Sequence, residues 1–377
     1  MSIKAEPSFS LKDQLFNERS VGELSSRLAT ADPGFRRSDF ESDVLARFPA
    51  LELKERINWI VTVLERHLPA HFPDARNTLL RALPEPLDPT RTDDDFGSFI
   101  WVVPGEYVAK HGCTEGYLVE SLAFLREATK RFSSEGAIRP FLDRFPDETM
   151  AFVHECSVDE NYHVRRLASE GIRPFLPWAM RVKLPAGIII SVLDTLHGDN
   201  TRYVTRSVAN TLNDISKTDA DAVLETLERW REQACQQEAE LEWMTRHALR
   251  TLLKDDNAAA LNLLGYPTAP KFRVSGQRSS DVVRDGQDFV WACTLTSLAR
   301  QKLKITLRIH FLKANGKHSA KVFAVKNGDF DKGDTVEINK RQSFKPITTR
   351  ALYPGTHYAE LVVNGVTRKK LAFELVS

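Results

Sequence analysis

The chain has 377 residues, more than one hydrophobic core usually serves, and this length predicts at least two units. Its 52 Lys and Arg against 51 Asp and Glu give a net charge of +1, which excludes a uniformly basic or acidic protein. The sequence has no secretory leader pattern and no apolar run of about 18 residues, so we expect a soluble cytoplasmic protein without a membrane partner.

Helical periodicity begins near the N-terminus. Residues 10–82 carry apolar side chains three and four positions apart, which predicts helices. The pattern repeats poorly, so residues 1–90 are interpreted as an N-terminal cap. A connection rich in Pro and Asp follows at 84–97 (PEPLDPTRTDDDFG) and is interpreted as a loop that a ligand can order.

Clear repeats follow over residues 98–266. The expected helices are 115–132, 147–157, 160–176, 202–217, 219–234 and 241–254. One motif recurs at a spacing of 40 residues, as Val164-Arg165-Arg166, Val204-Thr205-Arg206 and Met244-Thr245-Arg246. A period near 40 in helical sequence is typical of HEAT repeats, stacked helix pairs that form an α-solenoid with a concave inner surface. Residues 1–266 are therefore predicted to form one HEAT-like helical repeat domain.

This motif predicts a row of cations. Arg166, Arg206 and Arg246 would occupy one position on successive inner helices, where they suit a polyanion such as DNA. Other basic residues complete the predicted phosphate-contacting set of the helical domain: Arg139, Arg165, Arg173, His247 and Arg250. A structural interpretation stays open for Arg165, because Asp159 precedes it by six residues and HEAT repeats use such pairs to join neighbouring repeats.

After Pro270 the hydrophobic period changes from helical to two. The run from Leu303 to Phe311 alternates apolar and polar side chains, and the dipeptides Asn315-Gly316 and Asn364-Gly365 indicate hairpin turns. Residues 271–377 are therefore predicted to form a small all-β immunoglobulin-like sandwich, with Trp291 in its core.

This C-terminal segment is also basic. It holds 20 Lys or Arg and 9 Asp or Glu, a balance of +11. Four of its cations cluster in an expected loop and are predicted to contact DNA: Lys340, Arg341, Lys345 and Arg350.

Common catalytic motifs are absent from the sequence. There is no phosphate-binding loop, GxGxxG run, HExxH pair or nucleophile elbow, and we expect no metal site and no cofactor. The four cysteines lack CxxC spacing and are interpreted as reduced structural thiols.

Four helical segments together resemble a known family: RFSSEGAIRPFL (131–142), HVRRLASEGIRPFLPWA (163–179), YVTRSVANTLNDIS (203–216) and RHALRTLLKDDNAAALNLLGY (246–266). They are similar to the bacterial AlkC-type branch of the HEAT-repeat DNA alkylation repair glycosylases. The segments GKHSAKVFAVK (316–326) and FKPITTRALYPGTHYAELVVNG (344–365) resemble the Ig-like domain fused to some members. The sequence departs from the family pattern at Gly136, where the pattern has a bulky aromatic residue.

The resemblance implies a DNA glycosylase of base excision repair. Its partner would be double-stranded DNA with cationic N-alkylated bases, mainly 3-methyladenine and also 3-methylcytosine or 1-methyladenine. A cationic base leaves as a neutral molecule and needs no general acid, so carboxylates that stabilise the oxocarbenium-like sugar and position water would suffice. The resemblance also implies that the base stays stacked instead of flipping into a pocket.

Candidate catalytic carboxylates are Glu120, Glu155 and Asp159, of which Asp159 can equally be a helix cap or a structural partner of the repeats. Trp178 is the candidate lesion-contacting aromatic, with a packing role left open. The alternative function is a non-catalytic HEAT-repeat scaffold that binds DNA or protein. We expect a monomer, because no dimer seam is evident.

Overall fold

The computed structural model describes residues 10–93, 95–345 and 351–376. The chain divides into two compact units, one of Met1–Ala222 with Arg229–Ala248 and one of Val223–Glu228 with Leu249–Ser377. In the described part, none of the helices combines the length and the apolar character needed to cross a bilayer.

The N-terminal helices confirm the helical periodicity of residues 10–82. They are α1 (Leu11–Leu15), α2 (Glu18–Ala31), α3 (Arg37–Leu45), α4 (Leu53–His67) and α5 (Phe72–Ala82), with the short turn η1 (Phe48–Ala50). Helix α2 begins at a capping box in which Asn17 and Ser20 satisfy each other's backbone amides. Its apolar stripe of Val21, Leu24 and Leu28 is fully buried. The described residues of 84–97 form no helix or strand, as predicted.

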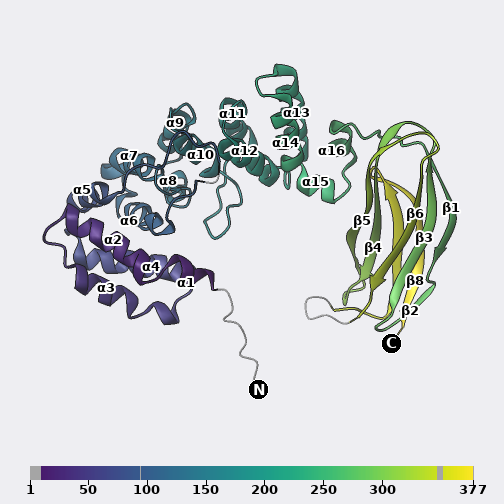
Figure 1. Ribbon diagram of the computed structural model, residues 1–377, viewed down its shortest axis with the longest axis horizontal. Helices are drawn as coiled ribbons and strands as arrows, with labels where there is room; N and C mark the ends of the chain where they lie inside the picture. Colours follow the sequence, from purple (N-terminus) through teal and green to yellow (C-terminus); the bar gives the residue numbers. More distant parts are fainter. Residues whose placement is uncertain (1–9, 94, 346–350, 377) are drawn as a thin grey trace. The chain divides into compact units, whose positions relative to one another are not determined.

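Helix pairs follow and form an arc within the first unit (Figure 1). The elements are η2 (Phe99–Trp101), α6 (Val102–Gly112), η3 (Glu115–Tyr117), α7 (Leu118–Ala128), α8 (Arg139–Arg144), α9 (Pro146–Ser157), α10 (Tyr162–Glu170), α11 (Ala186–Leu196), α12 (Arg202–Ile215), α13 (Ala220–Gln233) and α14 (Glu238–Ala248). Helices α6, α8, α10, α12 and α14 form the inner row of the arc, and α7, α9, α11 and α13 form the outer row (Figure 1). Helix α12 packs on both α10 and α14, so these three inner helices are continuous.

The expected helices differ from the observed ones mainly at their ends. The helix expected at 160–176 ends at Glu170, because Gly171 and Pro174 interrupt it. The helix expected at 241–254 is divided into α14 and α15 (Arg250–Lys254). Among the described residues, four helices lie outside the expected ranges: α6, α8, α11 and α16 (Ala258–Leu263). Helix α11 was not predicted because its run of isoleucines has no helical period. The four cysteines are free thiols, as expected.

Two sheets of mostly antiparallel strands make up most of the second unit. The strands are β1 (Phe272–Ser279), β2 (Val282–Arg284), β3 (Asp288–Ser297), β4 (Gln301–Leu312), β5 (His318–Phe330), β6 (Thr335–Ser343), β7 (Gly355–Val363) and β8 (Val366–Val376). One sheet has the order β1-β3-β6 and the other the order β2-β8-β7-β4-β5. Phe289 of the first sheet stacks on Phe373 of the second at 4.2 Å between ring centroids, so the sheets pack face to face.

The sandwich confirms the two-residue period and the hairpin signals. Leu303, Ile305, Leu307, Ile309 and Phe311 are all buried between the sheets. Trp291 is fully buried in the same core, as predicted. The dipeptide Asn364-Gly365 alone connects β7 to β8, and both residues have positive φ, 49° and 78°, as a type I′ turn requires.

The last helices, α15 and α16 (Ala258–Leu263), are attached to the sandwich. Asp256, between them, is buried and accepts hydrogen bonds from Lys304 and Thr306 of β4. The Tyr266 hydroxyl lies 2.6 Å from Asn327 Oδ1 on β5. Residues 249–266 therefore belong to the compact unit of the β-sandwich, although they are helical.

Candidate nucleic-acid interface

The arginines of the 40-residue motif lie on three consecutive inner helices. Arg166 is on α10, Arg206 on α12 and Arg246 on α14. Their side chains are 14%, 33% and 45% exposed, so access to solvent increases along the row. Each is neutralised by a carboxylate of the protein. A DNA phosphate can therefore bind these arginines only by displacing the carboxylates or by binding beside them.

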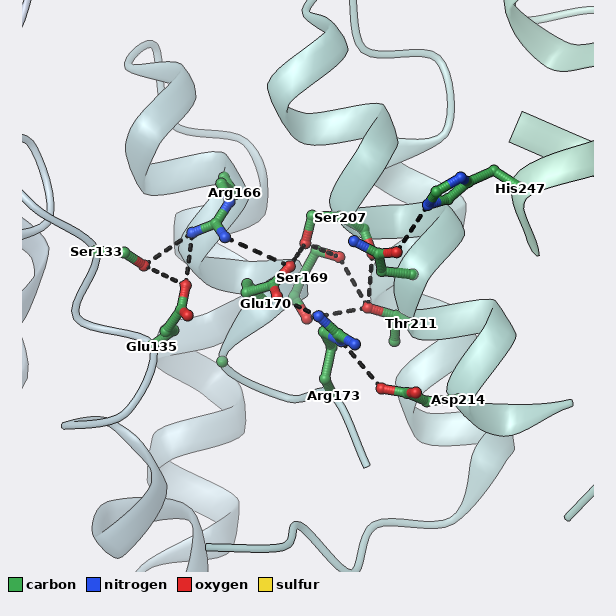
Figure 2. A network of polar contacts seen from close by, with 12 residues as sticks. Ser133, Glu135, Arg166, Ser169, Glu170, Arg173, Ser207, Thr211, Asp214 and His247 are labelled. Atoms are coloured by element: carbon green, nitrogen blue, oxygen red, sulfur yellow. Dashed lines mark hydrogen bonds and ion pairs between the residues drawn. The ribbon is translucent and has the colours of Figure 1, made fainter. Parts of the chain in front are cut away.

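Arg166 is held by two carboxylates, those of Glu135 before α8 and of Glu170 at the end of α10 (Figure 2). Its Nη1 donates to Glu135 at 2.7 Å and to the Ser133 hydroxyl at 2.8 Å, while Nη2 lies 3.7 Å from Glu170. Its guanidinium also lies 4.5 Å from the centre of the Tyr203 ring. Burial alone would lower the pKa of Arg166, but Glu135 and Glu170 outweigh it and raise that pKa. Arg166 is therefore a fixed positive charge within the protein.

Glu170 continues this network towards α12. It accepts a hydrogen bond from Ser207 at 2.6 Å and pairs with Arg173. Arg173 in turn donates from Nε to Asp214 at 3.0 Å (Figure 2). Burial raises the pKa of Glu170, but the guanidiniums of Arg166 and Arg173 reverse this and lower it. The network joins neighbouring repeats with alternating buried charges, and Arg173 is 9% exposed.

Arg139 has a structural role instead of the predicted phosphate contact. It is 1% exposed, and its guanidinium donates to the backbone carbonyls of Met180, Gly171 and Arg173. Burial, helped by the nearby Arg173 guanidinium, lowers the pKa of Arg139 to about 10. Arg139 fixes the irregular segment between α10 and α11, and we do not retain it as a DNA contact.

Arg165 has the structural role that the sequence left open, but its ionic partner is Asp199 and not the expected Asp159. Its Nε and Nη2 reach the Asp199 carboxylate at 2.5 and 3.2 Å. The preceding repeat uses the same arrangement, because Arg126 pairs with Asp159, whose side chain is 4% exposed. Asp159 therefore joins two repeats, and we do not retain it as a catalytic candidate.

Glu120 and Glu155 lie in a different setting. Glu120 is in the first turn of α7 and Glu155 is near the end of α9, both exposed. Within the described residues, neither carboxylate makes a hydrogen bond or ion pair. Glu155 is close enough to Arg126 to add to the raised pKa of that guanidinium, whose main cause is the hydrogen bond with Asp159. The structure thus brings Glu155 near Arg126 and Asp159, and it gives no contact between Glu155 and Glu120.

Trp178 protrudes from the irregular segment between α10 and α11. Its side chain is 74% exposed, which excludes a place in the core. Its backbone has a φ of 60°, a conformation that costs free energy for a residue with a Cβ. Lys54 of α4 donates to the Trp178 carbonyl at 2.7 Å and helps to hold this conformation.

The last predicted cations of the helical region lie near α14. Arg246 pairs with Glu242 at 2.6 Å, and His247 Nε2 lies 2.8 Å from Asn210 Oδ1. The His247 ring stacks on Trp243 at 4.9 Å. Arg250 is exposed on α15 and belongs to the second compact unit.

Lys340 and Arg341 lie on strand β6, which corrects their expected place in a loop. They pair with Trp291 and Val290 of β3, and Arg341 is exposed. Lys345 follows β6 and is exposed, whereas Arg350 lies outside the described residues. A strand gives these side chains a fixed register, with neighbours pointing to opposite faces.

Two features of this region were missed from the sequence. Asp93, in the acidic connection, pairs with Arg206, a contact over 113 residues that no local pattern signals. Glu106, on inner helix α6, is partly buried and makes no hydrogen bond or ion pair among the described residues. Burial raises the pKa of Glu106, against a smaller opposing effect of Lys54. A Cβ added at Gly136 would lie 3.0 Å from Glu106 Oε1, so the glycine leaves space for this carboxylate.

Comparisons with known proteins cover both compact units. Residues 274–377 match the family described as the C-terminal Ig-like domain of the uncharacterised protein YhaZ. The chain is 31% identical over 369 residues to the uncharacterized protein YhaZ of Bacillus subtilis strain 168, covering 96% of this chain and 98% of that protein. The structure of Pseudomonas fluorescens alkylpurine DNA glycosylase AlkC, bound to DNA containing an abasic site analog, matches with a TM-score of 0.79. That match has 31% identity and covers 98% of this chain and 100% of the other.

Proposed function

The chain belongs to the AlkC-type family of DNA glycosylases, and on that premise we propose that it excises cationic N-alkylated bases from double-stranded DNA. The observation that carries this proposal is the match to DNA-bound AlkC over 98% of the chain, which includes both the helical repeats and the sandwich. We propose 3-methyladenine as the principal substrate, with 3-methylcytosine and 1-methyladenine as further ones.

The proposed chemistry needs little from the protein. A base alkylated on a ring nitrogen carries a positive charge, so the electron pair of the breaking N-glycosidic bond neutralises it as it leaves. The sugar becomes an oxocarbenium-like cation, which a nearby carboxylate stabilises. A water then attacks C1′ and gives its proton to a carboxylate acting as general base.

We propose Glu120, in the first turn of outer helix α7, and Glu155, in the last turn of outer helix α9, for these roles, so that the DNA sugar would meet the ends of these helices. Both are exposed, and neither makes a hydrogen bond or ion pair among the described residues, so their charge is available to a cation. Asp159 is unsuitable, because Arg126 already neutralises it in a buried pair. Which of the two glutamates faces the sugar is decided by the separate effects of their Gln variants.

We propose that the base stays in the helical stack during excision. Trp178 protrudes into solvent instead of lining a cavity, and would meet the DNA as a surface contact. The cavity beside Arg139, of about 200 Å³, is lined by no aromatic ring that could stack on a flipped base. Its wall consists of Arg139, Leu142, Asp143, Pro146, Arg181, Val182, Lys183 and Leu184.

The test is base release from methylated duplex DNA in the presence of EDTA, followed by chromatography. We expect 3-methyladenine among the products, while a duplex containing uracil, whose base is neutral, should release nothing. DNA binding without any released base would contradict the enzyme and support the scaffold alternative.

A further inference from the structure

The acidic connection between α5 and η2 lies against the first turn of helix α12. The Tyr203 amide donates to the Thr92 carbonyl at 3.0 Å, and Arg206 donates to the Asp93 carboxylate. The Phe96 ring meets the Tyr203 ring edge to face, with centroids 5.5 Å apart. These contacts place Thr92, Asp93 and Phe96 on inner helix α12, beside one arginine of the 40-residue motif.

In this arrangement, oxygen atoms of the protein occupy the positions that a bound anion would take. A carbonyl oxygen and a carboxylate of the protein lie where an amide near the N-terminus of α12 and a guanidinium both present donors. A phosphate group of DNA carries oxygens of the same kind and binds the same donors. Among the described residues, the segment 88–96 contains three aspartates and one arginine, so it also resembles the DNA backbone in charge.

The closed arrangement leaves buried polar atoms without partners. Asp93 Oδ1, Tyr162 Oη and His163 Nε2 are buried and have no hydrogen-bond partner among the described residues. Asp93 Oδ1, which belongs to the connection itself, would regain water on opening, and this lowers the free energy needed to lift the connection. The ion pair itself is partly exposed, with 33% of the Arg206 side chain and 23% of the Asp93 side chain accessible, and pairs of this kind are weak.

We propose that Asp93 occupies a DNA phosphate site in the DNA-free protein, and that the duplex displaces Thr92, Asp93 and Phe96 from Arg206 and the start of α12. This inference rests on the proposed function, because it takes DNA as the competing ligand. It assigns the acidic connection a role that sets DNA affinity, by making phosphate compete with an internal carboxylate.

The test compares D93N with D88N in duplex binding, measured by fluorescence anisotropy on DNA containing an abasic-site analog. Both variants remove one negative charge from the same segment, but the Asp88 carboxylate accepts hydrogen bonds from Thr90 and, among the described residues, makes no contact with Arg206. We expect D93N to bind about two- to five-fold more tightly, the range expected for losing an exposed ion pair, and D88N to differ little from wild type. Equal tightening by both variants, or weaker binding by D93N, would overturn the inference.

A double-mutant cycle separates this inference from the proposed function. We expect R206Q to weaken binding and to abolish the gain from D93N, because the competition acts through that guanidinium. A gain from D93N that persists beside R206Q would contradict the inference. Base release by the wild type is measured separately, so failure of the glycosylase activity is distinguishable from failure of the competition.

Discussion

Arg165 and Asp199 join helix α10 to the turn before α12 through two hydrogen bonds, of 2.5 and 3.2 Å. The next position along α10, Arg166, is held by carboxylates of its own. Adjacent arginines of one motif thus have different partners: Arg165 pairs with Asp199 before α12, and Arg166 pairs with Glu135 before α8. The repeat motif therefore contributes to stability through Arg165 and to the charge of the inner face through Arg166, and mutations at the two positions separate these roles.

Replacing Arg165 by Met should destabilise the helical unit strongly. The change leaves Asp199, whose side chain is 4% exposed, as a buried charge without its partner. Breaking a buried pair in this way costs about 3–5 kcal/mol. Urea denaturation followed by circular dichroism measures the loss. The matched control is R246M, which removes a half-exposed pair and should change stability by less than about 1 kcal/mol; equal losses in both variants would contradict the structural role.

Phosphate contacts should appear in the salt dependence of DNA binding. We expect R246Q and R341Q each to reduce the slope of log K against log salt by about 0.9, the value for one neutralised phosphate. Anisotropy titrations at several salt concentrations measure the slope. R300Q carries the same charge change at a 91% exposed side chain outside the predicted set, and it should leave the slope unchanged. A reduced slope for R300Q alone would remove the other two arginines from the interface.

Glu106 should make stability depend on pH. Burial raises its pKa in the folded state, so the folded protein is stabilised while this carboxyl is protonated and loses that stability as pH rises through the raised value. The E106Q variant lacks this loss. Its melting temperature should equal that of wild type near pH 4 and exceed it by a few degrees at pH 8, where about 1 kcal/mol corresponds to about 2–4 °C. A lower melting temperature at pH 8 would mean that the charged carboxylate is stabilising.

His163 should act in the opposite direction. Burial lowers its pKa to about 4, so between pH of about 6.5 and 4 the unfolded chain binds a proton that the folded protein excludes. Stability is then lost as pH falls through this window. Thermal unfolding at pH 7, 6 and 5 should fall less steeply for H163F than for wild type. The exposed His71 provides the control H71Q, which should retain the wild-type slope.

The fold was largely predictable because its signals are local. The 40-residue motif located the inner helices α10, α12 and α14, and Asn364-Gly365 located a hairpin. Helix α11 was not predicted because three consecutive isoleucines fit a buried strand as well as a helix. The hydrophobic periods of helices and strands indicate which face of each element is buried. This was sufficient to assign the helical-repeat and β-sandwich architectures.

The candidate site was less predictable because its contacts are not local. Nothing in the sequence indicates that Asp93 meets Arg206, or that Arg139 ends among three backbone carbonyls. Residue type and spacing predicted where the arginines lie but not which of them are neutralised. Glu120 and Glu155 are exposed, whereas Asp159 is buried in its pair with Arg126. Only the folded structure shows this difference in exposure.

The most direct measurement is single-turnover release of 3-methyladenine from a defined duplex, made in parallel with binding to the same DNA, for wild type, E120Q, E155Q and the double variant. We predict release by wild type in EDTA, a decrease of at least about a hundred-fold in at least one single variant, and DNA affinity within two-fold of wild type. Release that is unchanged in the double variant would contradict the assignment of these carboxylates. Tight binding without release by wild type would contradict the glycosylase itself.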